Sequence, residues 1–380
     1  MKILFVGEYS RLHNSLKEGL IAKGHQTVLI SSGDYFKKID QDYSFHSSIL
    51  SDYWIFQKPN NLLYKLTRID LVKVERALRF YFLIPKLKGF DHVQLINSDA
   101  IGTFPLLSRI LYKKLFKKIK SRSLLICGDE TPIIDYLLKN EIRYSILTPY
   151  FEDTSLKKEF QFPLKYSQNN YRKTFNWLVQ NCQSLIASDL DYKIPMKKMG
   201  YSVNFIPNPI NTTKLKYQEL IIKDKIIIFL GINRGSYEKK GIIFFEKALS
   251  IIQEKFNTKV EVIVSENIPY KKYINLYNKA HILMDQVYAF DQGYNALEAM
   301  AKGKIVFTGA EKEFETHYNL NKKVAINALP DVDYLVAQLS FLIENPEELI
   351  AMGKRARTFI EKEHYYIKIA EKYLEVWEKN

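Results

Sequence analysis

The sequence is poor in cysteine and lacks long apolar runs, and each absence excludes a class of protein. Only 2 of its 380 residues are cysteine. That is too few for a disulfide framework, and the separation of Cys127 from Cys182 suits no zinc site. No uncharged apolar stretch reaches the roughly 18 residues that cross a bilayer. The N-terminus, Met1 to Gly7, is too short and too quickly polar for a secretory signal. We therefore expect a cytoplasmic protein.

The chain has the length and composition of a folded protein with two domains. Its 380 residues are 47% hydrophobic and 26% charged, an ordinary balance that allows two cores of normal size. The charge is uneven, because residues 1–200 hold 31 basic and 19 acidic residues, whereas residues 201–380 hold 25 and 23. A basic half beside a near-neutral half suggests a polyanionic partner on one side only.

Strands and helices alternate along the first half. Residues 34–69 show no clear periodicity and are predicted to form an irregular excursion that could recognise an acceptor. The loop from Glu8 to His13 lacks the G-x-G-x-x-G of a dinucleotide site, which argues against an NAD-dependent enzyme. The alternation is typical of a parallel sheet. Strands are predicted over 2–7, 26–31, 92–97, 123–128 and 184–188, and helices over 12–23, 72–87 and 133–138.

A basic amphipathic helix is predicted over residues 106–120. Leu107, Leu111, Leu115 and Ile119 form one apolar stripe, and lysines follow on the remaining face. Such a stripe usually packs on a sheet and leaves the lysines in solvent. A basic amphipathic helix can also lie on an anionic membrane. The two interpretations are not exclusive, and both stay open.

Two residues of the first half are candidate site residues because of their positions. Asp129 follows the strand 123–128, and substrates bind at the carboxyl ends of parallel strands. It could equally cap the helix that starts near Pro132. His13 stands in the first strand-to-helix loop, where it could act as a general acid or base or serve as a capping or surface residue.

The stretch from Met284 to Gly309 has the features of a nucleotide site. A strand ending near Val287 leads through a polar loop around Gly293 to a helix that opens near Asn295 and carries Glu298 in its first turn. Free N–H groups at a helix N-terminus attract phosphate, and a carboxylate one turn later can accept hydrogen bonds from a ribose. The same features could reflect only the helix macrodipole and a glycine turn.

Three segments resemble the retaining glycosyltransferases of the GT-B fold, glycosyltransferase family four and its relatives. Residues 291–303, D-Q-G-Y-N-A-L-E-A-M-A-K-G, resemble their E-G-x-G-x4-E and A-M-A-x-G signature, with Phe290 in place of the first glutamate. Residues 206–212 resemble the linker between the two domains of these enzymes. Residues 231–241 resemble the loop whose arginine and lysine bind the donor diphosphate, with one residue more between the two.

The resemblance implies an α/β fold of two Rossmann-like, doubly wound domains that face a cleft. Residues 1–205 would form the acceptor-binding domain, and residues 206–363 the domain that binds the nucleotide-sugar donor. The C-terminal helix, about residues 364–380, would cross back to the first domain.

The implied activity is the retaining, metal-independent transfer of a sugar from a nucleoside-diphosphate donor, such as a UDP- or GDP-sugar, to a glycan or lipid-linked acceptor in surface polysaccharide synthesis. No cofactor and no nucleic acid partner is expected. The basic half could contact an anionic membrane at the inner face of the cell membrane. The implied catalytic residues are Arg234 and Lys240 at the diphosphate, with Asp129 and His13 as the first candidates for other roles. The implied donor-binding residues are Glu298 at the ribose, and Gly293, Tyr294, Asn295, Asp285, Asp291 and Lys239 around the phosphates and sugar.

Two other functions remain compatible with the sequence. The same fold could serve a nucleotide-sugar epimerase or hydrolase. A degenerate GT-B protein, lacking the first motif glutamate, could bind an anionic surface or nucleic acid without catalysis.

Overall fold

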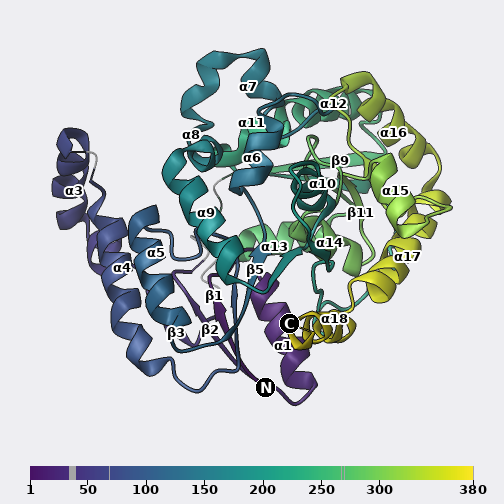
Figure 1. The fold of residues 1–380 in the computed structure, drawn as a ribbon. Coiled ribbons are helices and arrows are strands. Elements are labelled where there is room, and N and C mark those ends of the chain that lie inside the picture. The colour runs from purple at the N-terminus through teal and green to yellow at the C-terminus, as the bar shows by residue number, and fades with distance from the viewer. Residues whose placement is uncertain (34–39, 68, 267, 269, 380) are drawn as a thin grey trace.

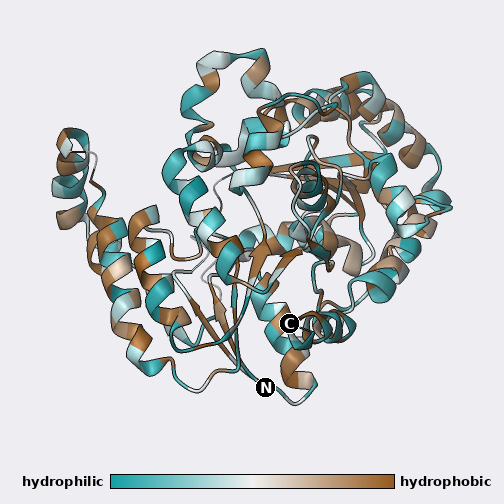
Figure 2. Cartoon of the chain, in the orientation of Figure 1, coloured by the Kyte–Doolittle hydropathy of each residue, from teal (hydrophilic) through white to brown (hydrophobic). Residues whose placement is uncertain are grey.

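The computed structural model describes residues 1–33, 40–67, 69–266, 268 and 270–379, and these form two sheets with helices around each (Figure 1). The strands of the first sheet lie within residues 2–205 and those of the second within residues 226–327. The strands are predominantly hydrophobic in both sheets (Figure 2), as expected where helices cover a parallel sheet. The α/β prediction is confirmed.

The first sheet has seven strands in the order β3-β2-β1-β4-β5-β6-β7, all paired in parallel. β1 pairs with β2 on one side and with β4 on the other, so the strand order reverses there and leaves a crevice at the carboxyl ends. The strands are β1 (Lys2–Val6), β2 (Gln26–Ser31), β3 (Tyr43–Ser44), β4 (His92–Leu95), β5 (Ser121–Ile126), β6 (Ser184–Ala187) and β7 (Asn204–Phe205).

The helices of the first domain follow the predicted alternation, with boundaries that differ by a few residues. The longer ones are α1 (Leu12–Ala22), α4 (Leu71–Leu83), α5 (Pro105–Phe116), α6 (Thr131–Leu137), α9 (Asn169–Asn181) and α10 (Leu190–Lys198). Shorter helical segments are α7 (Thr148–Glu152), α8 (Gln161–Leu164) and the 3-10 turns η2 (Ile84–Lys86), η3 (Thr154–Lys158) and η4 (Lys165–Ser167).

The prediction of an irregular excursion over residues 34–69 is wrong for most of the segment. Residues 48–52 form α2 (Ser48–Asp52) and residues 54–67 form α3 (Trp54–Thr67), whereas 34–39 and 68 lie outside the described residues. In α3 the one buried residue among those described is Asn60. A helix that turns so little of its surface to a core has no core-facing apolar stripe, which is the signal that sequence periodicity detects.

The basic helix predicted over residues 106–120 is α5. Leu111, Leu115 and Ile119 are at most 5% exposed, and Leu107 packs against the same core. The lysines at 113, 114, 117, 118 and 120 are exposed. The apolar stripe therefore packs inside the domain, and the solvent-facing side of the helix carries lysines together with Leu106 and Ile110.

The second sheet has five parallel strands in the order β12-β11-β10-β8-β9. They are β8 (Ile226–Ile232), β9 (Val260–Glu266), β10 (Ile282–Met284), β11 (Ile305–Thr308) and β12 (Ile326–Asn327). The surrounding helices are η5 (Arg234–Ser236), α11 (Tyr237–Lys240), α12 (Ile242–Lys255), α13 (Tyr270–Lys279), α14 (Tyr294–Ala301), α15 (Lys312–Tyr318), α16 (Val332–Glu344) and α17 (Pro346–Glu363).

The last helix, α18 (Tyr366–Glu378), packs on the first domain rather than the second. It lies against α1, and the Trp377 ring stacks on His92 of β4 with centroids 4.4 Å apart. The chain reaches it through a short parallel bridge in which the Ile210 N–H donates to the His364 carbonyl at 2.7 Å. The N- and C-terminal segments of the chain thus share one core.

Candidate active site

A cavity of about 410 Å³ opens between the carboxyl ends of the two sheets. Loops that follow parallel strands at these ends are the expected binding edge of such sheets. The first domain lines the cavity with residues after β1, β4, β5 and β6, including Tyr9, Asn97, Asp129 and Asp189. The second lines it with residues after β8 and β10, including Lys239, Lys240, Gln286, Tyr288, Phe290 and Gly293.

Lys240 lies in the wall of this cavity beside a buried carboxylate. Its Nζ is 3.0 Å from Oδ1 of Asp285, which is 4% exposed. Asn295 Nδ2 donates to the same oxygen at 3.2 Å, and Thr308 Oγ1 donates to the other at 3.3 Å. The structure thus brings three of the predicted residues, Lys240, Asp285 and Asn295, to one point.

Gly241 lets the loop that carries Lys240 approach the loop after β10. Its φ is +63°, a left-handed conformation that glycine adopts without strain. A Cβ here would lie 2.9 Å from the Val287 Cβ and 3.1 Å from the Tyr288 ring. The close approach allows the Val287 N–H to donate to the Lys240 carbonyl at 2.9 Å. The glycine of the predicted K-G pair therefore has a packing reason.

Asp129 and Lys239 join the two domains across the cavity. The Lys239 Nζ is 3.0 Å from Oδ2 of Asp129, whose side chain is 10% exposed. Asp129 does not cap the following helix, because the N-cap of α6 is Glu130, which accepts a hydrogen bond from the Thr131 N–H. The capping role considered for Asp129 is therefore wrong, and its carboxylate faces the cavity instead.

Glu130 is a buried acid that sequence reasoning missed. Its carboxylate also accepts hydrogen bonds from the N–H and hydroxyl of Ser98 at 2.8 and 2.6 Å, which ties the loop after β4 to α6. Burial raises its pKa to about 7, although the hydrogen bonds oppose this shift. The available signal was an acid directly before Thr131-Pro132 at a strand end.

The helix after the candidate nucleotide loop begins earlier than predicted. α14 starts at Tyr294 with Gly293 as its N-cap, so its first turn carries no acidic residue. Glu298 is the fifth helical residue and lies in the second turn, which makes the prediction of a first-turn position wrong. Glu298 is partly exposed and does not line the cavity.

The side chain of Tyr294 fastens this helix to the first domain. Its hydroxyl is hydrogen-bonded with Ser15 of α1 and donates to the Pro209 carbonyl at 3.0 Å. Burial raises its pKa well above the usual value, and the charge of Glu298 adds to the shift. The phenol is thus neutral and holds the start of α14 against α1 and Pro209. The backbone N–H groups at this helix start are the groups suited to an anionic ligand.

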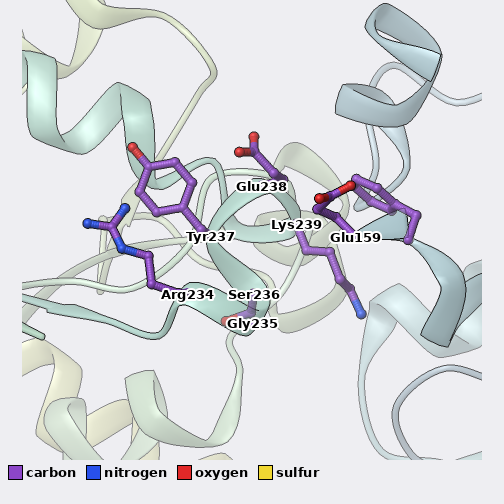
Figure 3. Close-up of a pocket in the computed structure, with 8 residues that line it drawn as sticks. Glu159, Arg234, Gly235, Ser236, Tyr237, Glu238 and Lys239 are labelled. Carbon is purple, nitrogen blue, oxygen red and sulfur yellow. The ribbon is translucent and has the colours of Figure 1, made fainter. Parts of the chain in front are cut away.

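Arg234 lies outside the main cavity, in a smaller hollow of about 270 Å³. Its guanidinium donates to both carboxylate oxygens of Glu266, at 2.7 and 2.6 Å, and lies 4.8 Å from the centre of the Tyr237 ring. Figure 3 shows Arg234 and Lys239 pointing to different sides of the loop. The predicted convergence of Arg234 with Lys240 is therefore wrong for this structure, because Glu266 at the end of β9 holds the guanidinium.

His13 is fully buried, so its expected place at a cap or on the surface is wrong. Its Nδ1 is 2.7 Å from the Gly7 carbonyl, and its Nε2 is 3.1 Å from Nε2 of Gln94. Burial lowers its pKa to about 3, which keeps the imidazole neutral. Glu8 caps the helix in its place, accepting a hydrogen bond from the Asn14 N–H at 2.9 Å. The position of His13 gives it no access to the cavity.

Asp291 belongs to a cluster of three carboxylates at the domain junction, of which Asp189 and Asp291 are buried and Asp191 is half-buried. It accepts a hydrogen bond from the Leu190 N–H at 3.1 Å, while Asp191 of the first domain accepts from the N–H groups of Phe290 and Asp291, at 2.9 and 3.2 Å. Asp189, 5% exposed, completes the group. Each domain thus caps backbone donors of the other.

Burial raises the pKa of every carboxyl in this cluster. The pKa of Asp291 rises to about 6 and that of Asp191 to about 7, in both cases mainly through burial. The pKa of Asp189 rises well above its usual value, because burial combines with the two neighbouring negative charges. Asp189 and Asp191 were missed, although Asp189 follows a strand end just as Asp129 does.

The site therefore gathers some of the predicted residues and leaves others outside. Asp129, Lys239, Lys240 and Gly293 line the cavity. Asp285, Asn295 and Asp291 stand directly behind its wall, while Arg234, His13 and Glu298 do not line it. Within the described parts of the chain, no group of three or more His, Cys, Asp or Glu side chains could hold a metal ion.

Comparison with known proteins adds a family match that runs from α12 into α18. Residues 244–375 match a family described as glycosyl transferase-like. A search of curated proteins found no match.

Solved structures share the whole fold at low sequence identity. Sucrose-phosphate synthase from Thermosynechococcus elongatus superposes with a TM-score of 0.62 at 13% identity, over 100% of this chain and 98% of the other. HepE from Anabaena, solved with UDP and glucose, gives 0.61 at 11% identity over 100% of both chains. The UDP-GlcNAc 2-epimerase from Neisseria meningitidis gives 0.55 at 14% identity over 100% of both chains. The predicted GT-B fold of two Rossmann-like domains is thus confirmed, and residues 244–375 are similar to a glycosyl transferase-like family.

Proposed function

We propose that the protein transfers a sugar from a nucleoside-diphosphate sugar to a hydroxyl of a glycan or lipid-linked acceptor. The observation that carries the proposal is the cavity between the sheets, where Lys240 stands beside the N-terminal end of α14. A helix N-terminus and an ammonium group are both suited to a diphosphate. The similarity to HepE, whose structure holds UDP and glucose, supports the same ligand class.

In the proposed donor complex, the diphosphate competes with Asp285 for Lys240. The backbone N–H groups at the start of α14 would receive the phosphate oxygens, and Lys239 would supply a second cation from the same loop. Glu298 is proposed to bind the ribose from the second turn. Arg234 joins only if its side chain turns from Glu266 toward the phosphate, because two of its N–H groups donate to that carboxylate.

The proposed chemistry is retaining and independent of metal. The bond between the anomeric carbon and the diphosphate breaks, and a bond to the acceptor oxygen forms on the same face of the sugar. The acceptor proton passes to the departing phosphate oxygen. Fixed cations stabilise the developing charge of the leaving group, which is worth roughly 3–4 kcal/mol for one well-placed donor.

The acceptor is proposed to enter from the first domain. That side of the cavity is largely apolar and aromatic, with Ile133, Leu137, Ile142, Phe162 and Tyr166 along it. Such a wall suits the face of a sugar ring or an apolar part of a lipid-linked acceptor. These features fit a role in surface polysaccharide synthesis at the inner face of a membrane.

The test is a panel of UDP, GDP and their sugars, assayed for thermal stabilisation and then for transfer. Saturation at 100 times the Kd should stabilise the fold by about 2.7 kcal/mol, and a labelled sugar from the stabilising donor should appear on an added glycan or lipid acceptor. Stabilisation by heparin or nucleic acid but by no nucleotide would overturn the proposal.

A second candidate is a nucleotide-sugar epimerase or hydrolase, which the similarity to UDP-GlcNAc 2-epimerase favours. The two functions differ in what happens without an acceptor. An epimerase or hydrolase consumes UDP-GlcNAc alone and releases an epimer or free sugar, whereas a transferase requires the acceptor for full turnover. Phe290 in the place of the motif glutamate favours a third possibility, a degenerate protein. Such a protein would bind the nucleotide without forming a product.

A further inference from the structure

Helix α3 stands almost wholly exposed at one end of the first domain. It lies at the edge of the molecule beside α4 and away from the second domain (Figure 1). Its apolar side chains are on the surface: Trp54 is 68% exposed, Leu66 is 76% exposed, and Ile55 and Leu62 are each 61% exposed. A helix with so little burial gains little from the core, and its apolar surface is unexplained by the fold.

Exposed apolar side chains occur on both α3 and α4, which contact each other. Of the 23 large hydrophobic side chains that are exposed among the described residues, 12 lie between residues 49 and 82. On α4 they are Leu78, Tyr81 and Phe82, the last being 68% exposed. Single exposed apolar residues are ordinary, but a contiguous group marks a binding surface. We call the 12 exposed apolar residues between positions 49 and 82 the apolar arm.

The arm and its surroundings are strongly basic. Residues 48–120 hold 14 Lys and Arg against 5 Asp and Glu, so this fifth of the chain supplies a surplus of 9 within the net charge of +14. Residues 53–69 contain no acidic residue. The exposed lysines of α5 adjoin the arm, with the Lys114 Nζ 3.9 Å from the centre of the Tyr81 ring.

We propose that the apolar arm docks on a lipid bilayer that contains anionic lipids. A helix of 14 residues is about 21 Å long, so it suits a position in the plane of the interface. No helix described here has the length and apolar character to cross a bilayer. Trp and Tyr favour the headgroup level, and adjacent lysines are attracted to an anionic surface.

Charge decides between a bilayer and a second copy of the chain as the occupant. A symmetric dimer through the arm would bring two basic surfaces together, and like charges across an interface oppose association. An anionic bilayer is attracted to both the apolar side chains and the lysines of α5. A protein docked in this way would meet a lipid-linked acceptor at the membrane, and this link to the acceptor rests on the proposed function. Docking itself does not depend on that function.

The test is flotation of the full chain with vesicles of neutral phosphatidylcholine or of phosphatidylcholine mixed with phosphatidylglycerol. The wild type should float with the anionic vesicles and at least tenfold less with the neutral ones. The triple variant Trp54→Ser/Phe56→Ser/Leu62→Ser should lose flotation at least tenfold, with an unchanged Tm because these side chains contact little. Failure of the wild type to float, or wild-type flotation of the variant, would overturn the proposal.

Two controls separate the arm from general hydrophobicity and from self-association. Ile251→Ser/Phe341→Ser removes two apolar side chains that are 41% and 51% exposed on the second domain, and it should float like the wild type. Light scattering should find wild type and triple variant equally monomeric. A wild-type dimer that the triple variant abolishes, without vesicle binding, would assign the arm to a second copy and overturn the inference.

The lysines in α5 and in the turn directly after it provide a second, independent test. We expect a quadruple variant, Lys113→Gln/Lys114→Gln/Lys117→Gln/Lys118→Gln, to float with anionic vesicles about as weakly as the wild type does in high salt. This variant should no longer prefer anionic vesicles to neutral ones. Unchanged flotation would contradict the electrostatic part. Vesicle binding needs no nucleotide, and the triple variant should bind nucleotide like the wild type, so failure here is distinct from failure of the transferase proposal.

Discussion

At the scale of single residues, Lys240 has the position expected of a group that stabilises a leaving diphosphate. Its partner Asp285 is buried and held by Asn295 and Thr308, so the ammonium is held at the cavity wall before any ligand arrives. An electrostatic donor that is fixed in advance acts mainly on the transition state.

Lys240→Ala should therefore lower kcat by about 10²-fold and change KM much less. Initial rates of sugar transfer over a range of donor concentrations measure this split. Lys247→Ala, which removes an exposed lysine of the neighbouring helix α12, is the matched control and should behave like the wild type. Equal losses in kcat and in donor affinity would contradict leaving-group stabilisation.

Glu298 poses a different question, because it is the fifth residue of α14 and lies in the second turn rather than the first. If it binds the ribose, Glu298→Ala loses hydrogen bonds to a charged group worth roughly 1.5–3 kcal/mol, so nucleotide affinity should fall between about 10- and 150-fold. Calorimetry with the stabilising nucleotide measures the change, and Tm reports the fold. Glu261→Ala, an exposed acid of β9, is the comparison. Unchanged affinity in Glu298→Ala would remove the ribose assignment.

At the scale of elements, the loop between β8 and α12 depends on one backbone conformation. Gly241→Ala places a side chain at φ +63°, which costs about 1–2 kcal/mol, and its Cβ would press on Val287. We expect a loss of about 1–3 kcal/mol in the free energy of unfolding together with weaker donor binding, as denaturant titration and calorimetry would show.

Gly235 in the same loop provides the matched control for that substitution. Its added Cβ would meet only the Asn233 Oδ1, at 3.4 Å, and its φ is not in the left-handed region. Gly235→Ala should therefore change stability by less than about 0.5 kcal/mol. Equal effects of the two substitutions would show that the approach of Lys240 to Val287 does not depend on glycine.

The sequence predicts elements well where burial imposes a pattern. The strands predicted over 2–7, 26–31, 92–97, 123–128 and 184–188 and the stripe of α5 were recognised because their apolar residues face a core. The two-residue strands β3 and β7 are too short to show such a pattern and were not predicted. α3 was missed because it faces no core. The predicted start of α14 was about one residue too late, which is enough to move Glu298 into the second turn. Helix boundaries are hard to predict because they depend on local capping, here at Gly293, rather than on periodicity.

The placement of site residues depends on partners that are distant in sequence. Lys240 and Asp285 are 45 residues apart and Asp129 and Lys239 are 110 apart, and only the strand-end rule hinted that they meet. The pairing of Arg234 with Glu266 at the end of β9 had no local signal. Shared motifs thus indicate which loops face the cleft, whereas the direction of each side chain follows from tertiary packing.

At the scale of the whole molecule, the two domains are held together by contacts that border the cavity itself. Asp129 pairs with Lys239, and Tyr294 reaches Pro209 and α1. Arg143 of the first domain donates to Glu311 and Glu313 of the second at 3.1 and 2.8 Å. Any movement that widens the cavity must break some of these contacts, so ligand entry and domain cohesion are linked.

The buried carboxylates at this junction make the stability of the molecule depend on pH. The pKa of Asp291 and Asp191 rises from 3.8 in the usual state to about 6 and about 7. An acid with a raised pKa in the folded state binds its proton more tightly there than when unfolded. The folded state therefore gains most below about pH 4, and this stability falls as pH rises to about 7.

Asp189→Asn should reduce the loss of stability between pH 4 and pH 8, because asparagine carries no negative charge beside Asp191 and Asp291. Its side-chain oxygen can still accept the hydrogen bond from the Asp191 N–H, which measures 2.8 Å in the native protein. Tm measured from pH 4 to pH 8 should decline less in this variant than in the wild type and should be higher at pH 8. Glu130, with a pKa raised to about 7, still titrates and leaves a residual slope. Asp331→Asn replaces an exposed N-cap of α16 and should follow the wild-type profile. Parallel profiles for Asp189→Asn and the wild type would show that the junction does not hold its protons at neutral pH, and that the domains are joined there by fully charged carboxylates.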